Sequence, residues 1–243
     1  IKHVTTGYTD VIGGDILFSD NNKIGSVPDG VWGIEKETSL RGSATGSGYA
    51  IIYNLSRFTP APGMAPLTIV TTQYAQNRKN LKQEYCIFKD ELSLDTQAFA
   101  VPLFDQESQR VIVAVLIYYG SNNGSSEANY RQNVAAIMKE LVAFYPEADA
   151  FFTSVHVNPK NTDSGLKTML AGLDDATPFV EGWDLDCLSE MTQVDGNSSF
   201  YTLVYTKTGE SGSVTVDPAQ VPKQANVSDG GYTVTVRVGK NDQ

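Results

Sequence analysis

The alternation of apolar runs and polar breaks along the chain predicts a series of short β-strands. The runs are rich in β-branched and aromatic residues, as is typical of buried strands bounded by turns. The predicted strands cover residues 1–6, 31–34, 49–53, 67–72, 83–88, 148–157, 200–206 and 232–238. Residues 58–66 contain three prolines, which we expect to exclude regular structure there.

A long β-hairpin and a helix form the strongest pattern. Residues 97–104 and 110–118 are apolar and flank a polar turn, as in a hairpin. A helix is predicted from Glu127 to Tyr145, capped by Ser126, and a short helix is predicted over residues 162–170. The long helix has apolar positions at helical spacing: Val134, Ile137, Met138, Leu141 and Phe144.

A strand, a crossover helix and a strand make a βαβ unit, and most of the remaining chain is predicted to be β. The chain has 243 residues, enough for one substantial core. It shows no internal repeat and no clear linker. We therefore predict a single α/β domain over residues 1–243.

The composition changes this picture in three ways. Charged residues are only 19% and the net charge is −10, which opposes binding to nucleic acid phosphates. No apolar run approaches the roughly 18 residues of a membrane span. The content of Ser, Thr and Asn, with sequons at Asn54, Asn123, Asn197 and Asn226, fits an extracellular or cell-surface protein. Because the chain begins at Ile1, we also expect it to be a processed product.

The two cysteines leave two alternatives. Cys86 and Cys187 are too few for a disulfide scaffold and too far apart in sequence for a metal knuckle. They form either one long-range disulfide or two buried thiols, and we favour the thiols.

Several common catalytic patterns are missing from the sequence. It has no Gly-x-Ser-x-Gly elbow and no cluster of His and Cys for a metal. The glycine-rich segment 42–48 lacks the lysine of a phosphate-binding loop. An acidic patch could bind calcium, but a solvated loop is the favoured interpretation. The patch consists of Glu181, Asp184, Asp186 and Glu190.

The order of these elements resembles the endonuclease/exonuclease/phosphatase superfamily, the fold of deoxyribonuclease and sphingomyelinase-type enzymes. The family's Gly-Asp-x-Asn motif aligns with residues 155–158, and its Ser-Asp-His motif aligns with residues 228–230. The resemblance covers residues 97–238 and, earlier, only residues 33–37 and 48–53. It implies two packed mixed β-sheets flanked by helices, a four-layer sandwich.

The resemblance also implies where an active site would be. Glu35 or Glu37 matches the front glutamate that holds a divalent cation in the family, although solvated charges beside a loop are the favoured interpretation. Asn158 and Asp229 match their family positions. His156, however, replaces the family's Asp, and a neutral imidazole supplies no anionic oxygen to a hard cation.

The family's catalytic histidines are replaced as well. Gly230 stands in the place of the His of Ser-Asp-His. Tyr118 and Tyr119 stand at the hairpin end where the family usually has a His, and two tyrosines there suit either a binding surface or simple packing.

Three functions remain open from the sequence. The leading prediction is a secreted or cell-surface domain without catalysis or cofactor, which binds an unidentified protein or small molecule through the former active-site face. The second is a divergent metal-dependent phosphoesterase that uses Glu37, His156, Asn158 and Asp229 with magnesium or calcium. The third is a structural module of a larger extracellular assembly.

Overall fold

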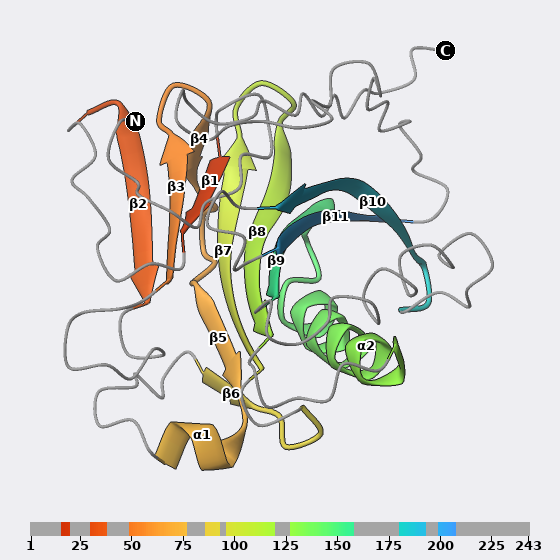
Figure 1. The fold of residues 1–243 in the computed structure, drawn as a ribbon. Helices are drawn as coiled ribbons and strands as arrows, with labels where there is room; N and C mark the ends of the chain where they lie inside the picture. The colour runs from red at the N-terminus through yellow and green to blue at the C-terminus, as the bar shows by residue number, and fades with distance from the viewer. Residues whose placement is uncertain are drawn as a thin grey trace.

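The computed structural model describes residues 16–19, 30–37, 49–76, 86–92, 96–119, 127–157, 180–192 and 199–207. These ranges contain eleven strands and two helices, arranged in two β-sheets (Figure 1). The predicted strands at 1–6 and 232–238 and the predicted helix at 162–170 lie outside them. Among the described helices, none is both long enough and apolar enough to cross a membrane.

The larger sheet has eight strands in the order β10-β11-β9-β8-β7-β5-β6, with β4 paired to β7. Its parallel pairs are β5 with β6 and β8 with β9, and the other pairs are antiparallel. The strands are β4 (Phe58–Pro60), β5 (Leu67–Val70), β6 (Cys86–Phe88), β7 (Gln97–Asp105), β8 (Arg110–Tyr119), β9 (Ala150–Val157), β10 (Trp183–Thr192) and β11 (Ser199–Lys207).

The smaller sheet consists of β1 (Ile16–Ser19), β3 (Tyr49–Asn54) and β2 (Trp32–Glu37), in that order. Both of its pairings are antiparallel. Gly33 on β2 lies opposite Tyr53 on β3, and a Cβ atom added at Gly33 would meet the Tyr53 ring. The pairing of β2 with β3 therefore depends on glycine at position 33, which leaves room for the Tyr53 ring.

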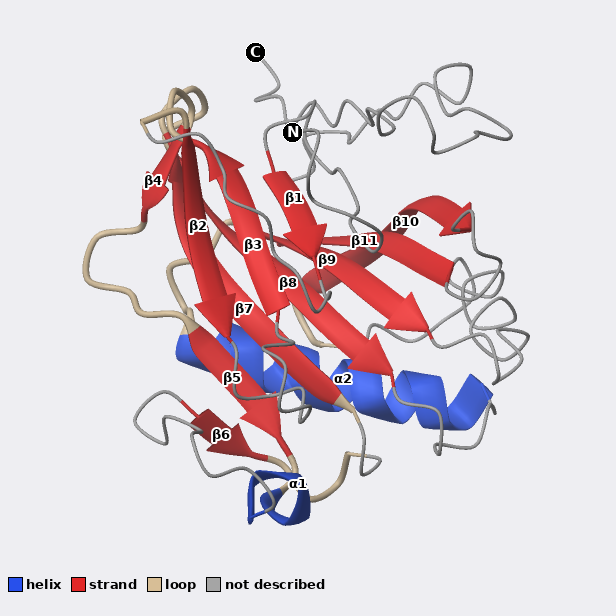
Figure 2. Cartoon of the chain, turned by 60° about the vertical axis from the view of Figure 1, so that its left-hand side comes forward, coloured by secondary structure: helices blue, strands red, loops and turns tan. Residues whose placement is uncertain are grey.

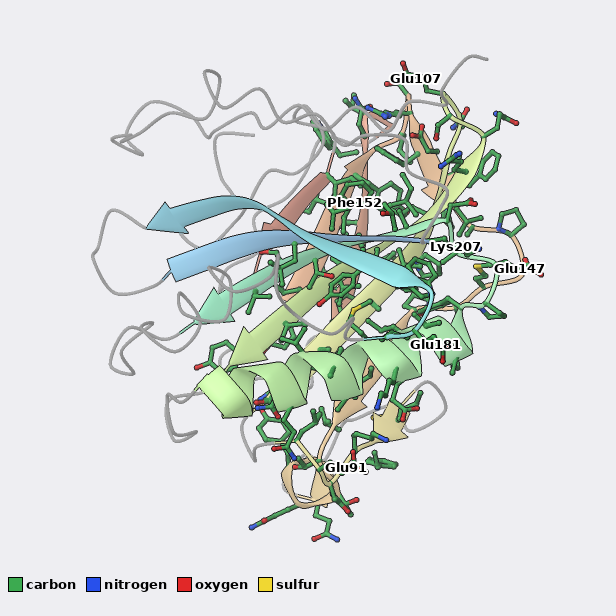
Figure 3. All side chains as sticks on the ribbon, turned by 90° about the vertical axis from the view of Figure 1, so that its right-hand side faces the viewer. Glu91, Glu107, Glu147, Phe152, Glu181 and Lys207 are labelled. Atoms are coloured by element: carbon green, nitrogen blue, oxygen red, sulfur yellow. The ribbon has the colours of Figure 1, made fainter. Side chains whose placement is uncertain are left out.

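The two sheets pack face to face and enclose one of two hydrophobic clusters. Ile51 of the smaller sheet and Phe99, Leu116 and Phe152 of the larger sheet belong to this inner cluster. Figure 3 shows Phe152 within the sandwich. Burial of these side chains is the main favourable term that holds the sheets together.

The second cluster lies between the larger sheet and helix α2 (Glu127–Phe144), which runs along its outer face (Figure 2). Val134, Ile137, Met138 and Leu141 are buried there, as predicted. Phe144, the last apolar position of the helical repeat, is 42% exposed and does not join them. The next residue, Tyr145, is buried in this cluster instead, and its N–H still donates to the Leu141 carbonyl at 2.8 Å.

The structure confirms the predicted α/β class, the two packed sheets, the 97–118 hairpin and the βαβ unit. In that unit, β8 and β9 are parallel and α2 connects them. Helix α2 forms the helical layer over the larger sheet. A helix layer over the smaller sheet is not among the described elements.

Residues 58–66 are not wholly irregular, which corrects the prediction from their prolines. Phe58, Thr59 and Pro60 form strand β4 and pair with β7. The proline is tolerated because it ends a short strand that pairs on one side only.

The acidic segment near residue 185 is a strand rather than the predicted solvated loop. Asp184 and Asp186 lie in β10, which pairs antiparallel with β11 at the edge of the described sheet. Glu181 precedes the strand, in an exposed turn. Alternating apolar and polar residues fit a strand with one exposed face, so the charges do not prevent pairing.

Cys86 is a free thiol, so the disulfide alternative for the two cysteines is wrong. The thiol is only partly buried. Burial, together with the nearby charge of Glu37, raises its pKa to about 11. The thiol is therefore protonated at neutral pH.

Candidate functional site

Five strands bring candidate residues together at one end of the sandwich. Glu37, the last residue of β2, pairs with Tyr49, the first residue of β3. Gln97 at the start of β7 pairs with Tyr118 near the end of β8, which in turn pairs with His156 near the end of β9. We call these five residues the strand-end site. Sequence positions that lie far apart thus converge through strand pairing.

The centre of the strand-end site is a neutral, hydrogen-bonded unit that connects the two sheets. The Tyr49 hydroxyl donates a hydrogen bond of 2.8 Å to Oε1 of Gln97. Both side chains are buried, with exposures of 0% for Tyr49 and 2% for Gln97. The Tyr118 ring lies beside Tyr49, with centroids 6.4 Å apart and planes at 38°. Two phenol groups and one amide group therefore occupy the centre of the strand-end site.

Ser154 lies two residues before His156 on β9. Position 154 is on the same face of the strand as Phe152, which belongs to the inner cluster between the sheets. The Ser154 hydroxyl is buried and has no hydrogen-bond partner in the described part of the chain. A buried hydroxyl without a partner costs roughly 1–3 kcal/mol, so a bound molecule that reached it would be favoured.

The two glutamates of β2 are strand residues, not solvated charges beside a loop. Glu35 and Glu37 alternate with the exposed Lys36 and are only partly exposed themselves. Burial raises the pKa of Glu35, and its charge is a secondary cause of the raised pKa of Tyr53. The carboxylates thus lie toward the inner side of the sandwich, as their pairing with Tyr49 and Ile51 requires.

The structure brings together some of the predicted site residues and leaves others outside the described ranges. Glu37, Tyr118 and His156 are at the same end, and Tyr119 pairs with Val157 at the following step. Asn158 and Asp229 fall outside the described residues. Within those ranges, no group of three or more His, Cys, Asp or Glu side chains is placed to hold a metal ion.

Tyr49 and Gln97 were not among the site residues predicted from the sequence. The predicted hairpin contained a signal for Gln97, because counting back from its turn places this residue opposite Tyr118. Tyr49 gave no comparable signal. Its hydrogen bond joins residues 48 positions apart in two different sheets.

Comparison with known proteins gives likenesses of structure only. No protein-family model and no curated protein matches the chain. The human Nocturnin catalytic domain with bound sulfate anion is 12% identical, with 72% of this chain and 73% of that chain covered and a TM-score of 0.39. D. rerio TDP2 complexed with a single-strand DNA product is 9% identical, with 77% and 66% covered and a TM-score of 0.42.

A third similar structure is the endonuclease/exonuclease/phosphatase from Bacteroides vulgatus. It is 10% identical, with 71% of this chain and 76% of that chain covered and a TM-score of 0.37.

Proposed function

We propose that this protein is a non-catalytic domain that binds a ligand or partner through the strand-end site. The observation that carries the proposal is the buried hydrogen bond from Tyr49 to Gln97, with the Tyr118 ring beside it. These groups occupy the end of the sandwich where the sequence resemblance places the metal and the attacking water.

The chemistry of these groups supports binding over hydrolysis. A hard cation needs carboxylate oxygens, and a water nucleophile needs a base within hydrogen-bond reach. Glu37 is the one carboxylate of the strand-end site, and within the described ranges no group of three or more His, Cys, Asp or Glu side chains is placed to hold a metal ion. At the centre of the site the Tyr49 hydroxyl is hydrogen-bonded to the Gln97 amide. Aromatic rings with a few polar groups are instead the usual lining of ligand sites.

We further propose an extracellular or cell-surface location and a partner other than nucleic acid. The net charge of −10 supports the second point, because nucleic acid binding draws its affinity from clustered Lys and Arg. The polar composition and the sequons support the first. No cofactor enters the proposal.

A turnover assay tests the absence of catalysis. The purified chain is incubated with magnesium, manganese or calcium and with a generic phosphodiester or DNA. We expect no hydrolysis above the buffer rate. Metal-dependent turnover that disappears in His156→Ala or Asp229→Ala, while Glu107→Ala retains it, would establish the phosphoesterase alternative instead. Glu107 is a suitable control because it is 76% exposed and lies in the turn that joins β7 to β8, at the opposite end of these strands from Gln97 and Tyr118 (Figure 3).

A further inference from the structure

The sequon formed by Asn54, Leu55 and Ser56 lies wholly within the described residues. Asn54 is the last residue of β3, and the next three residues lead to β4. The backbone N–H of Arg57 donates to the Asn54 carbonyl at 3.1 Å, which closes a turn. Ser56 is exposed within this turn, and Asn54 and Leu55 are partly exposed. The other three sequons fall outside the described ranges.

Two hydrogen bonds orient the carboxamide of Asn54. Its Oδ1 atom accepts one from the backbone N–H of Ser56 at 3.0 Å and one from the Ser56 hydroxyl at 2.8 Å. A backbone N–H can only donate, so the side-chain atom that faces it must be the oxygen. Nδ2, the atom that carries the sugar in an N-linked glycan, is therefore the branch of the carboxamide that lies away from Ser56.

The second of these bonds uses the third sequon residue in a specific way. An Asx turn needs only the bond from the backbone N–H of residue 56, which any residue except proline could supply. The bond from the side chain needs a hydroxyl group close to the backbone. Ser and Thr are also the two residues that an N-glycosylation sequon accepts at this position. The contact between Ser56 and Asn54 thus matches the requirement for a glycan acceptor.

The surface beside the turn has room for a sugar. A pocket of about 430 Å³ adjoins the turn and is open to solvent, with Ser56, Arg57, Gln106 and Glu107 as its lining. Its volume is within the range of small-molecule sites. An oligosaccharide attached to this turn can therefore extend into solvent without displacing the core.

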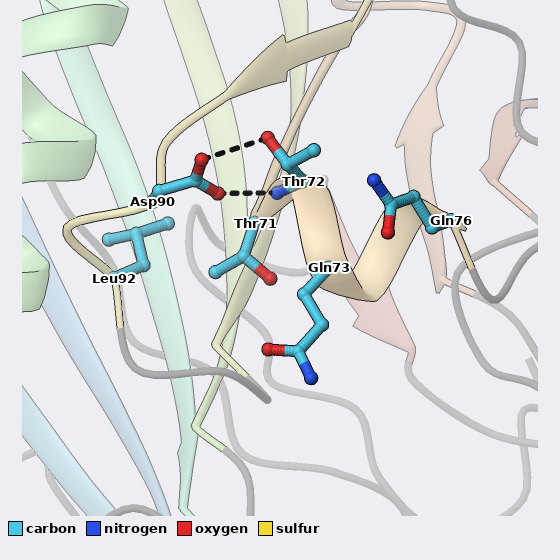
Figure 4. A pocket seen from close by; sticks show the side chains of 6 residues that line it. All are labelled: Thr71, Thr72, Gln73, Gln76, Asp90 and Leu92. Atoms are coloured by element: carbon cyan, nitrogen blue, oxygen red, sulfur yellow. Dashed lines mark hydrogen bonds between the residues drawn. The ribbon is translucent and has the colours of Figure 1, made fainter.

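A different polar pocket, of about 380 Å³, lies beside helix α1 (Thr72–Gln76) (Figure 4). There the Asp90 carboxylate accepts hydrogen bonds from the Thr72 backbone N–H at 2.7 Å and from the Thr72 hydroxyl at 3.0 Å. These bonds hold the turn after β6 against the helix, so they explain the acid as part of the fold. The pocket beside Ser56 differs because a sequon borders it.

The sequon lies at the far end of β3 from the strand-end site. Tyr49 is the first and Asn54 the last residue of β3, so about 17 Å of extended strand separates them. Arg57 contacts Asp105, at the opposite end of β7 from Gln97. A glycan on Asn54 would therefore be attached at the end of the sandwich opposite the strand-end site.

From these contacts we propose that Asn54 is an acceptor for an N-linked oligosaccharide. In the reaction, Nδ2 of Asn54 loses one proton to solvent and forms a bond to C1 of the first sugar. The bond from C1 to the diphosphate oxygen of a polyprenyl-diphosphate-linked oligosaccharide breaks, and the polyprenyl diphosphate leaves. In the native protein the modification rests on the proposed extracellular or cell-surface location, and not on ligand binding at the strand-end site.

The test is expression of the full chain behind a secretion leader in a eukaryotic host, followed by peptide mass spectrometry before and after enzymatic removal of N-linked glycans. We expect an oligosaccharide on the peptide that contains Asn54, and its loss in Ser56→Ala. Ser56→Thr should keep the oligosaccharide, because threonine supplies the same hydroxyl. Peptide mapping identifies each sequon separately, so a glycan elsewhere is not counted for Asn54.

Asn54→Asp is the matched control for the structural role of the turn. Its carboxylate can accept both hydrogen bonds from Ser56 but has no nitrogen to modify, so this variant should fold, as circular dichroism would show, and should lack the glycan. An unmodified Asn54 in the secreted, folded chain would overturn the proposal, as would modification that persists in Ser56→Ala. Because the leader delivers the chain, the result does not depend on its native location, and failure of the proposed function would appear instead in the turnover assay.

Discussion

At the scale of single residues, Asp105 shows how one buried charge stabilises this fold. Its carboxylate, 1% exposed, accepts hydrogen bonds from Arg57 at 3.2 and 3.0 Å and from the Ser108 hydroxyl at 2.9 Å. Burial alone would raise the pKa of Asp105, but these bonds outweigh it and lower the pKa below its ordinary value of 3.8. The ionised carboxylate therefore stabilises the folded state.

The lowered pKa fixes the sign of a pH dependence. The contribution of Asp105 is fully present above its unfolded pKa of 3.8 and is lost as pH falls toward the lower folded value. We expect Asp105→Asn to lower the free energy of unfolding by about 3 kcal/mol at pH 7, and by less near pH 3. Urea denaturation at both pH values measures this difference.

Glu107→Gln is the matched control for Asp105. Glu107 also contacts Arg57, at 3.4 Å, but its side chain is 76% exposed. An exposed ion pair contributes at most about 1 kcal/mol, so this variant should change stability little at either pH. Equal losses in the two variants, or a loss for Asp105→Asn that does not depend on pH, would refute this account of the charge.

Two buried tyrosines make a second comparison between residues. The Tyr145 hydroxyl donates a 2.7 Å hydrogen bond to the Ala65 carbonyl, whereas the Tyr205 hydroxyl has no partner within the described structure. Tyr145→Phe should therefore destabilise the protein by about 1–2 kcal/mol, and Tyr205→Phe should be neutral or stabilise it by about 1 kcal/mol. Chemical denaturation of both variants checks the prediction, which fails if Tyr205→Phe is the more damaging change.

At the scale of elements, the contact between β2 and β3 depends on Gly33. A methyl group at this position would meet the Tyr53 ring, so Gly33→Ala should cost about 1–3 kcal/mol by overpacking. If the clash is the cause, a smaller residue opposite should relieve it. The Gly33→Ala, Tyr53→Val double variant should then be less destabilised than the sum of the single changes, as a thermodynamic cycle would show. Strict additivity would contradict the proposed contact.

Local patterns predicted the elements that are continuous and apolar. Strand β8 is a long unbroken apolar run, and α2 has apolar residues at helical spacing. Both elements were therefore predicted with nearly correct bounds. Strand β4 was missed because Pro60 obscured it, and β10 was missed because Asp184 and Asp186 suggested a loop. In both cases pairing with a neighbouring strand outweighed the local preference.

At the scale of the whole molecule, the sequence located the candidate site only in part. The resemblance placed Glu37, Tyr118 and His156 at strand ends, and the pairing of β2, β3, β7, β8 and β9 brings these ends together. The contact of Tyr49 with Gln97 could not be predicted, because it depends on how the two sheets pack. The inward position of Glu37 likewise follows from the register of β2 against β3, which no local pattern shows.

The central claim is that the strand-end site binds without metal-dependent chemistry, and a divalent-cation titration tests it most directly. Isothermal titration calorimetry of the full chain with manganese, magnesium and calcium should show no saturable binding that depends on Glu37. Wild type and Glu37→Gln should therefore give the same heats, as should the control Glu107→Gln. Saturable binding in wild type that is lost in Glu37→Gln and kept in Glu107→Gln would contradict the account and favour the phosphoesterase.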